Sequence, residues 1–288
     1  MNSVQQQITG ATIANEVRLE GAVHEGSFLL VEGNDDAKLL SKFCDKEKCS
    51  ILVCFGRERL LDAITILEKG GFYRALAIAD RDFADIIDYP EYEGVVIFSD
   101  ETDMDIMIFQ SPALDHVLLE FGAPDRVAAI EAEGKRPRDL IFAAAKCIGA
   151  LRLLSQERGL SLRFAEMNYH FETRGSFQIN VRRTIQHIVG RSTPRPSLSD
   201  EAILCFVENH MNGIRDDRLL CNGHDCLRVL GKALKSRLGN TIDFDSGRGS
   251  KMLGSALRLA YEKDYFKRTK VCHSVRTWEE ITGFNVLQ

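Results

Sequence analysis

Short apolar runs that end at a glycine or an acid recur through the first 110 residues, and they constrain the fold more than any other feature. The runs cover residues 28–32, 50–55, 75–79 and 95–98. They are too short and too uniformly apolar for surface helices, and they are typical of strands buried on both faces. Amphipathic stretches, such as residues 57–69, separate the first three runs. This alternation predicts an α/β fold with a mainly parallel sheet flanked by helices.

The pattern changes after residue 130, where helical periodicity replaces the short apolar runs. Residues 138–154, 199–212, 224–238 and 250–265 are predicted as helices. The charge changes as well, from −13 over residues 1–130 to +8 over residues 131–288. A chain of 288 residues is long enough for one large domain or two small ones. We therefore expect an α/β domain over 1–130 and a helical, basic region over 131–288.

The composition also bears on location and on cysteine chemistry. No apolar run approaches the roughly 18 residues of a membrane-spanning helix. The first residues lack the basic-then-apolar order of a secretory signal. Eight cysteines are too dilute for a disulfide scaffold. These features predict a cytoplasmic protein with reduced thiols and no contact with a membrane.

Acidic side chains follow three of the predicted strands. Glu32 ends the first, Asp80 and Asp82 follow the third, and Asp103 and Asp105 follow the fourth. Ligands of open parallel sheets bind beyond the carboxyl ends of the strands, so these acids are expected to lie together. Extended backbone would turn both acids of the Asp-x-Asp pair the same way. Oxygen ligands without histidine or cysteine are typical of a Mg²⁺ or Mn²⁺ site.

A plainer interpretation applies to each acid by itself. An aspartate after a strand is common as a helix cap or a turn former. Asp35, at the start of the first predicted helix, is the best candidate for a plain cap. The metal-site hypothesis therefore depends on acids gathering at successive strand ends rather than on any single residue.

The order of three motifs resembles a known family. VEGNDD (31–36), IADRDF (78–83) and SDETDMDI (99–106) are similar to the motifs of a Toprim domain. The nearest likeness is to the Toprim-like nucleases allied to the OLD family, and among them to the stand-alone Toprim effectors of anti-phage defence. NGHDCLRVL (222–230) resembles a Gly-His-Asp element in the helical part of such proteins. The resemblance implies a Toprim-like sheet followed by a mostly helical region.

The resemblance also implies roles for individual acids. Glu32 would be the lead metal ligand and general base, and Asp36 a second-site ligand. Asp80 and Asp82 would hold the metal or metals, and Asp105 would assist. Family members often carry Glu two positions after this last Asp, where this chain has Met107. The number of metal ions, one or two, stays open for that reason.

The implied activity is metal-dependent hydrolysis of phosphodiester bonds in RNA, including transfer RNA, or in DNA, with Mg²⁺ or Mn²⁺ as cofactor. Lys232 is expected to reach the transition-state phosphate, and His224 and Lys235 to bind substrate. The resemblance further implies a toxic effector of anti-phage defence, activated through a partner ATPase. No GxxxxGK[ST] loop occurs in this chain, so that ATPase would be a separate protein. Homodimers are common among proteins of this kind.

Other functions stay open from the sequence. A phosphatase of the haloacid dehalogenase type would use Asp80 as nucleophile and Asp82 as acid-base, but it leaves Glu32 without a role. A receiver-like phosphoacceptor would pair Asp35 and Asp36 with Asp80. A non-catalytic Toprim-like regulatory or binding protein would account for Met107.

Overall fold

The computed structural model describes residues 7–87, 95–164, 167, 172, 177–239, 244 and 247–288. The chain forms two compact units. The sheet unit comprises Met1–Arg81, Asp88–Met104 and Glu262–Gln288, and the helical unit comprises Asp82–Ile87 and Asp105–Tyr261. Among the described residues, no helix is both long enough and apolar enough to cross a membrane.

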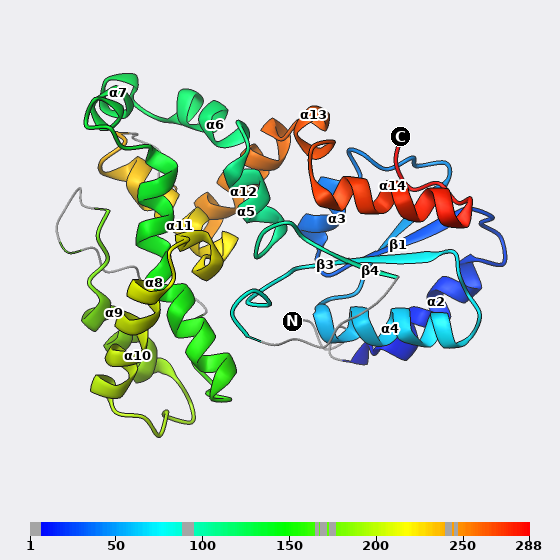
Figure 1. Ribbon diagram of the computed structural model, residues 1–288, viewed down its shortest axis with the longest axis horizontal. Coiled ribbons are helices and arrows are strands. Elements are labelled where there is room, and N and C mark those ends of the chain that lie inside the picture. Colours follow the sequence, from blue (N-terminus) through cyan, green and yellow to red (C-terminus); the bar gives the residue numbers. More distant parts are fainter. Residues whose placement is uncertain are drawn as a thin grey trace. The chain divides into compact units, whose positions relative to one another are not determined.

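The centre of the sheet unit is a four-stranded parallel sheet (Figure 1). Its strands are β1 (Ser27–Val31), β2 (Cys49–Val53), β3 (Ala75–Ala79) and β4 (Val96–Phe98). They are ordered β2-β1-β3-β4. Every residue of β1 and β3 is buried, which explains why these strands appear in the sequence as continuous apolar runs. The predicted α/β fold with a parallel sheet is confirmed.

Helices cover both faces of this sheet. On one face, α2 (Gly10–Glu20) packs against α4 (Arg57–Lys69). On the other lies α14 (Lys270–Thr282), as Figure 1 shows. The short helices α3 (Asn34–Leu40) and α13 (Lys263–Phe266) complete the unit.

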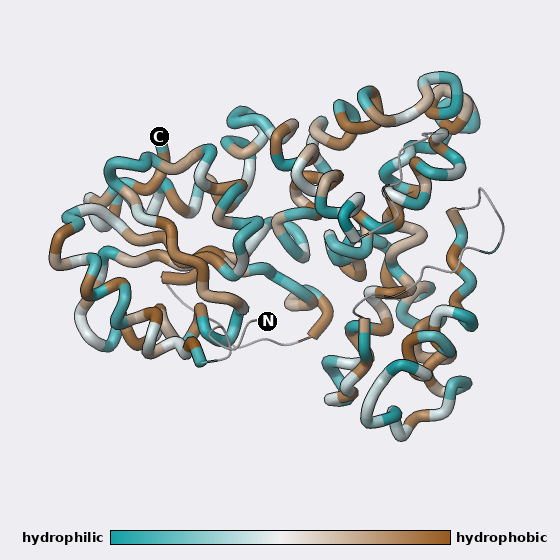
Figure 2. Tube along the Cα trace, turned by 180° about the vertical axis from the view of Figure 1, so that it is seen from behind, coloured by the Kyte–Doolittle hydropathy of each residue, from teal (hydrophilic) through white to brown (hydrophobic). Residues whose placement is uncertain are grey.

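The main core of the sheet unit lies between the sheet and the α2–α4 pair. It joins apolar side chains from the two helices and from one face of β1 and β3: Ile13, Ala14, Val17, Leu60, Ile64, Leu67, Phe28, Leu30, Ala75 and Ala77. In Figure 2 the strands are mostly hydrophobic along their length, whereas the helices alternate between hydrophilic and hydrophobic residues. This core holds the strand ends, and the acids on them, in a fixed register.

The helical unit is built around the long helix α8 (Pro137–Glu157). This helix packs against α10 (Asp200–Gly213), α11 (Gly223–Lys235) and the 3-10 helix η1 (Asp217–Leu220). The unit also contains α5 (Met104–Gln110, its first residue in the sheet unit), α6 (Ala113–Phe121), α7 (Pro124–Ala132), α9 (Val181–Arg191) and α12 (Gly247–Ala260). The predicted helical C-terminal region is confirmed.

The division of the chain differs from the boundary expected at residue 130. Residues 262–288 return to the sheet unit, where α14 packs on β4. The helix predicted over 250–265 is correspondingly interrupted, with α12 ending at Ala260 and α13 beginning at Lys263. Composition and periodicity do not predict that the chain returns to the sheet unit, because amphipathic helices occur in both units.

Candidate functional site

Two of the predicted acids lie at the point where the strand order reverses. β1 has β2 on one side and β3 on the other, so the chain passes from β1 to β2 in one direction and then crosses back to β3 in the opposite direction. Glu32 directly follows β1 and Asp80 directly follows β3. The crevice beyond such a reversal is the usual ligand position in open parallel sheets. The fold thus places Glu32 and Asp80 where the sequence predicted a site.

The two residues are in direct contact. Glu32 Oε1 accepts a hydrogen bond from the backbone N–H of Asp80 at 2.8 Å. Arg57 Nη1 donates to the Asp80 carbonyl oxygen at 3.1 Å. The Glu32 carbonyl oxygen accepts from Gly56 N–H at 3.0 Å, and Gly56 adopts a φ of 126° that side chains disfavour. These hydrogen bonds connect the segments that follow β1, β2 and β3. The Glu32 carboxylate is therefore held in one orientation.

The Asp80 carboxylate faces the start of the acidic run. Its Oδ1 accepts from the backbone N–H of Met104, the first residue of α5, at 3.4 Å. Asp103, just before this helix, is buried at 7% exposure. Asp80 therefore connects the end of β3 to the segment that contains the third acidic motif.

Ser99 is a positioning residue that sequence analysis missed. Its side chain is fully buried, and its Oγ accepts from Arg81 N–H at 2.9 Å and donates to the Glu101 carbonyl oxygen at 2.6 Å. One hydroxyl thus holds the loop after β3 to the loop after β4. A serine after a strand carries no distinctive signal, because the contact joins residues that are 18 positions apart.

Asp36, rather than Asp35, makes the described capping contact of α3. Asp36 Oδ2 accepts from the backbone N–H of Gly33 at 2.9 Å and so caps α3. Asp35, predicted as the plain cap, instead forms an exposed ion pair with Lys38 at 3.1 Å. The described capping contact comes from Asp36 because the side chain three positions after the N-cap can reach back to it.

Asp82 departs from the geometry expected of the Asp-x-Asp pair. β3 ends at Ala79, and Asp82 lies in a turn with a φ of 49°, in the left-handed region. The extended alternation that was expected to align Asp80 and Asp82 is therefore absent. Asp82 also belongs to the helical unit.

Asp105 lies on α5 in the helical unit and faces a buried cation. Its Oδ1 is 3.9 Å from Nη1 of Arg258, which is 7% exposed on α12. Arg258 thus places a positive charge next to the Asp105 carboxylate, which was predicted to assist metal binding.

The remaining predicted residues lie on α11. His224 is exposed, and its backbone N–H is capped by Asn222 Oδ1 at 3.0 Å. Lys232 is half-buried and Lys235 is exposed. The buried member of the Gly-His-Asp element is Asp225, which is 2% exposed.

Asp225 receives a two-point contact from α8. Arg152 Nε donates to Asp225 Oδ2 at 2.7 Å and Arg152 Nη2 to Oδ1 at 3.0 Å. Phe164 stacks on the guanidinium, with the ring centroid 4.3 Å from its carbon. The aspartate of this element therefore joins α11 to α8, a role that the sequence did not reveal.

A cysteine next to this edge has no catalytic character. Burial, together with the negative charge of Glu32, raises the pKa of the Cys54 thiol to about 12. The thiol therefore stays protonated at neutral pH.

The donor chemistry at the sheet edge suits a hard divalent cation. Glu32 and Asp80 supply carboxylate oxygens, which Mg²⁺ and Mn²⁺ prefer. In the described part of each unit, however, no three His, Cys, Asp or Glu side chains converge into a ready metal site. Glu32 and Asp80 are therefore of the residue types that bind such an ion, and backbone N–H groups hold their carboxylates.

Comparisons with known proteins add no assignment. No protein-family model matches the sequence. No curated protein matches it at a significant level.

Proposed function

We propose that this protein is a metal-dependent nuclease of the Toprim type that hydrolyses phosphodiester bonds in RNA, including transfer RNA, or in DNA. One observation carries the proposal: the Glu32 carboxylate and Asp80 meet at the strand-order reversal of a parallel sheet, joined by a 2.8 Å hydrogen bond. The order of motifs that resembles a Toprim domain supports the same activity.

Each acid at the edge has a distinct part in this proposal. When bound, Mg²⁺ or Mn²⁺ supplies an acidified water and neutralises the charge that develops on phosphate. Glu32 accepts the proton of the attacking water, and Asp80 N–H keeps its carboxylate in one orientation. Asp80 and Asp36 supply further oxygens. The metal-binding roles of Asp82 and Asp105, which belong to the helical unit, remain predictions from the resemblance.

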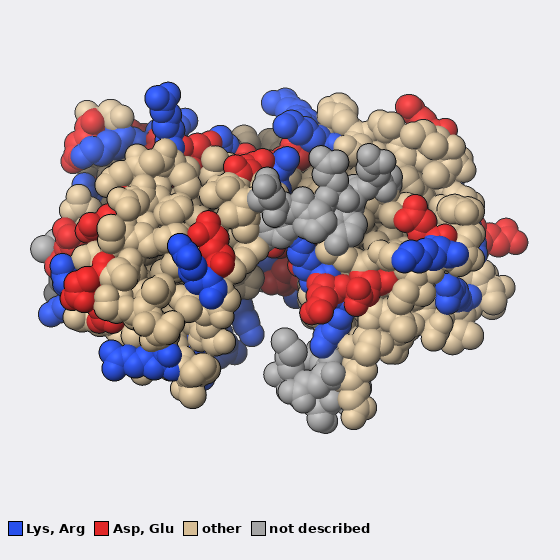
Figure 3. All heavy atoms as spheres, turned by 60° about the horizontal axis from the view of Figure 1, so that its bottom comes forward, with Lys and Arg blue, Asp and Glu red and all other residues tan. Residues whose placement is uncertain are grey.

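The helical unit is proposed to bind the substrate. Lys232 and Lys235 lie on α11, and His224 lies in its first turn. On the face shown in Figure 3, Lys and Arg are interspersed with Asp and Glu rather than gathered in one basic area. The proposed substrate contacts are Lys232, toward the scissile phosphate, and Lys235 and His224 beside it on the same helix.

The resemblance also suggests the biological setting. We infer a toxic effector of anti-phage defence that a separate ATPase holds inactive until infection. The partner, the substrate polymer and a homodimeric state are all part of this hypothesis.

The experiment that tests the activity is cleavage of end-labelled RNA, transfer RNA and DNA with Mg²⁺ or Mn²⁺, and with EDTA as the metal-free control. Glu32→Gln and Asp80→Asn keep the shapes of the side chains but remove their charge. We expect each to lower cleavage by about 100-fold or more. Asp35→Asn is the matched control, because Asp35 is in the same segment and pairs only with exposed Lys38 among the contacts described for it.

A second function is favoured by Met107, which stands where proteins of the resembled family often carry Glu. It is a non-catalytic Toprim-like binding protein. Calorimetry with Mn²⁺ separates the two. One result would contradict the nuclease proposal and identify the binding protein. It is Mn²⁺ binding that Glu32→Gln abolishes, together with no nucleic-acid cleavage even in the presence of the co-purified ATPase.

A further inference from the structure

The helical unit contains a cavity of about 540 Å³ that the proposed nuclease function does not use. Three segments line it: the end of α5, the start of α8 and the loop that leads from α10 into η1. The lining residues are Gln110, Arg136, Asp139, Phe142 and residues 215–218. All of them belong to the helical unit, so the cavity lies within one compact unit. Cavities of about 300 to 1,000 Å³ hold small-molecule ligands, including those of nucleotide size.

Two of the three aspartates that line this cavity are paired with arginines on the same lining. Arg136 Nε and Nη2 donate to Asp139 Oδ2 and Oδ1 at 2.8 and 2.9 Å. Arg218 Nε and Nη2 donate to Asp216 Oδ1 and Oδ2 at 2.9 and 2.6 Å. In both pairs the guanidinium contacts both carboxylate oxygens, which is the strong form of this interaction. The charges of these two aspartates are therefore compensated within the cavity.

The third aspartate is compensated from α8, and this leaves one arginine in excess. Lys146 Nζ donates to Asp217 Oδ1 at 2.8 Å. Arg215 lines the cavity from the loop before η1, and its side chain is exposed. Within the described part of the chain, Arg215 forms no ion pair and no hydrogen bond. The surplus positive charge of the cavity is therefore that of Arg215.

We propose that this cavity binds the phosphate group of a nucleotide, with Arg215 as its main contact. A guanidinium presents its N–H groups in a planar fork that matches two phosphate oxygens. Arg215 can make this contact without breaking an ion pair of the described structure. Arg136 supplies a second donor, because its contacts with Asp139 use Nε and Nη2 and not Nη1.

The other lining groups favour a nucleotide over a simple anion. Carboxylate oxygens can accept more hydrogen bonds than the ion pairs of Asp139 and Asp217 use. They are therefore available to hydroxyl or amino groups of a ligand, and the Gln110 amide can both donate and accept. A nucleotide combines one anionic group with such hydroxyl and amino donors. The same chemistry is present in a free nucleotide and in a nucleotide of a nucleic-acid chain.

The test is isothermal titration calorimetry of the full chain in EDTA. The probes are the common ribonucleoside 5′-monophosphates, their nucleosides, inorganic phosphate and a short single-stranded oligoribonucleotide. We expect at least one monophosphate to bind about tenfold or more tightly than its nucleoside and than inorganic phosphate. Tighter binding of the monophosphate than of the oligoribonucleotide would identify a free nucleotide as the ligand, and the reverse order would identify a nucleic-acid chain.

Variants connect this binding to Arg215. Arg215→Met should weaken the monophosphate about tenfold or more, and Arg215→Lys, which keeps the charge but loses the fork, should weaken it less. The urea midpoint of Arg215→Met should equal that of the wild type, because no described internal contact is lost. Arg182→Met is the matched control, since Arg182 is exposed on α9 and does not line the cavity.

The proposal is independent of the nuclease function, because no lining residue belongs to the proposed active site. Glu32→Gln should therefore bind the monophosphate with wild-type affinity. Four outcomes would overturn the proposal: no binding of any monophosphate or of the oligoribonucleotide, a nucleoside or inorganic phosphate that binds as tightly as the monophosphate, unchanged affinity in Arg215→Met, or an equal loss in Arg182→Met.

Discussion

Asp100, in the acidic run after β4, provides the sharpest test of which acids are structural. Its Oδ2 accepts from Lys270 N–H at 2.7 Å and its Oδ1 from Val271 N–H at 2.9 Å. Lys270 and Val271 are the first two residues of α14, and the N-cap Thr269 accepts from Cys272 N–H at 3.0 Å. Asp100 therefore completes the capping of a helix that begins 170 positions later in the chain.

The expected cost of removing this cap follows from its contacts. Hydrogen bonds to a charged acceptor contribute about 1.5 to 3 kcal/mol each when buried, and loss of a helix cap costs about 0.5 to 2 kcal/mol. Asp100 is half-buried, so water replaces part of what is lost. We expect Asp100→Ala to lower the free energy of unfolding by about 2 kcal/mol, and Asp100→Asn by about 1 kcal/mol, because one oxygen remains.

The assay uses the single tryptophan of the chain. Trp278 lies on α14 at 7% exposure, so its fluorescence reports release of this helix. With a urea slope of about 2 kcal/mol per M, the midpoint for Asp100→Ala should fall by about 1 M. Asp35→Ala, which removes an exposed ion pair with Lys38, is the control. A midpoint shift no larger than that of the control would refute the capping argument.

Two further predictions concern the helical unit. Asp225→Ala should lower the free energy of unfolding of this unit by about 3 kcal/mol in urea, because Arg152 loses a buried partner. The double variant Arg152→Met with Asp225→Leu should recover part of this loss, because it leaves no unpaired charge. The hydrogen bond from Arg218 holds the pKa of Asp216 below its ordinary 3.8, so its contribution to stability is complete above pH 3.8 and is lost as pH falls below that value. Arg218→Met should raise this pKa toward 3.8 in a carboxyl NMR titration, and an unchanged pKa would contradict the assigned cause.

The acids after β4 show why composition alone could not define the site. Asp100 caps α14, Asp103 is buried, and Asp105 faces Arg258. In the sequence these three residues are equivalent members of one acidic run. The partners of Asp100 and Asp105, which lie between residues 258 and 271, give these two acids separate roles.

The sequence by itself determined the parallel sheet and the position of its acids. β1 and β3 are buried on both faces, so their apolar runs identify them without knowledge of their neighbours. Parallel strands place their carboxyl ends at one edge, so Glu32 and Asp80 were predictable as neighbours. Both inferences use only local periodicity and the geometry of a sheet.

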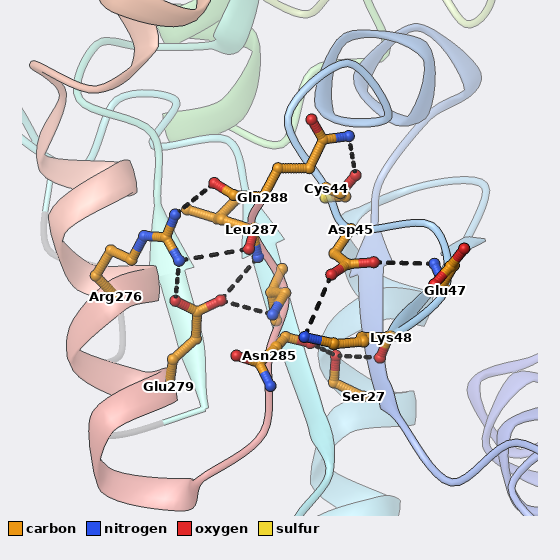
Figure 4. A network of polar contacts seen from close by, with 11 residues as sticks. Ser27, Cys44, Asp45, Glu47, Lys48, Arg276, Glu279, Asn285, Leu287 and Gln288 are labelled. Atoms are coloured by element: carbon orange, nitrogen blue, oxygen red, sulfur yellow. Dashed lines mark hydrogen bonds and ion pairs between the residues drawn. The ribbon is translucent and has the colours of Figure 1, made fainter.

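Only the tertiary structure decided which contacts those acids make and that residues 262–288 return to the sheet unit. The cap from Asp100, the two-point contact of Arg152 with Asp225, and the antiparallel bridge of Leu287 with Cys44 (Figure 4) join residues that are 170, 73 and 243 positions apart. Such contacts depend on how whole elements pack, and the side chains involved have no periodic pattern. The turn at Asp82, with its left-handed backbone, likewise departs from the extended alternation of the preceding strand.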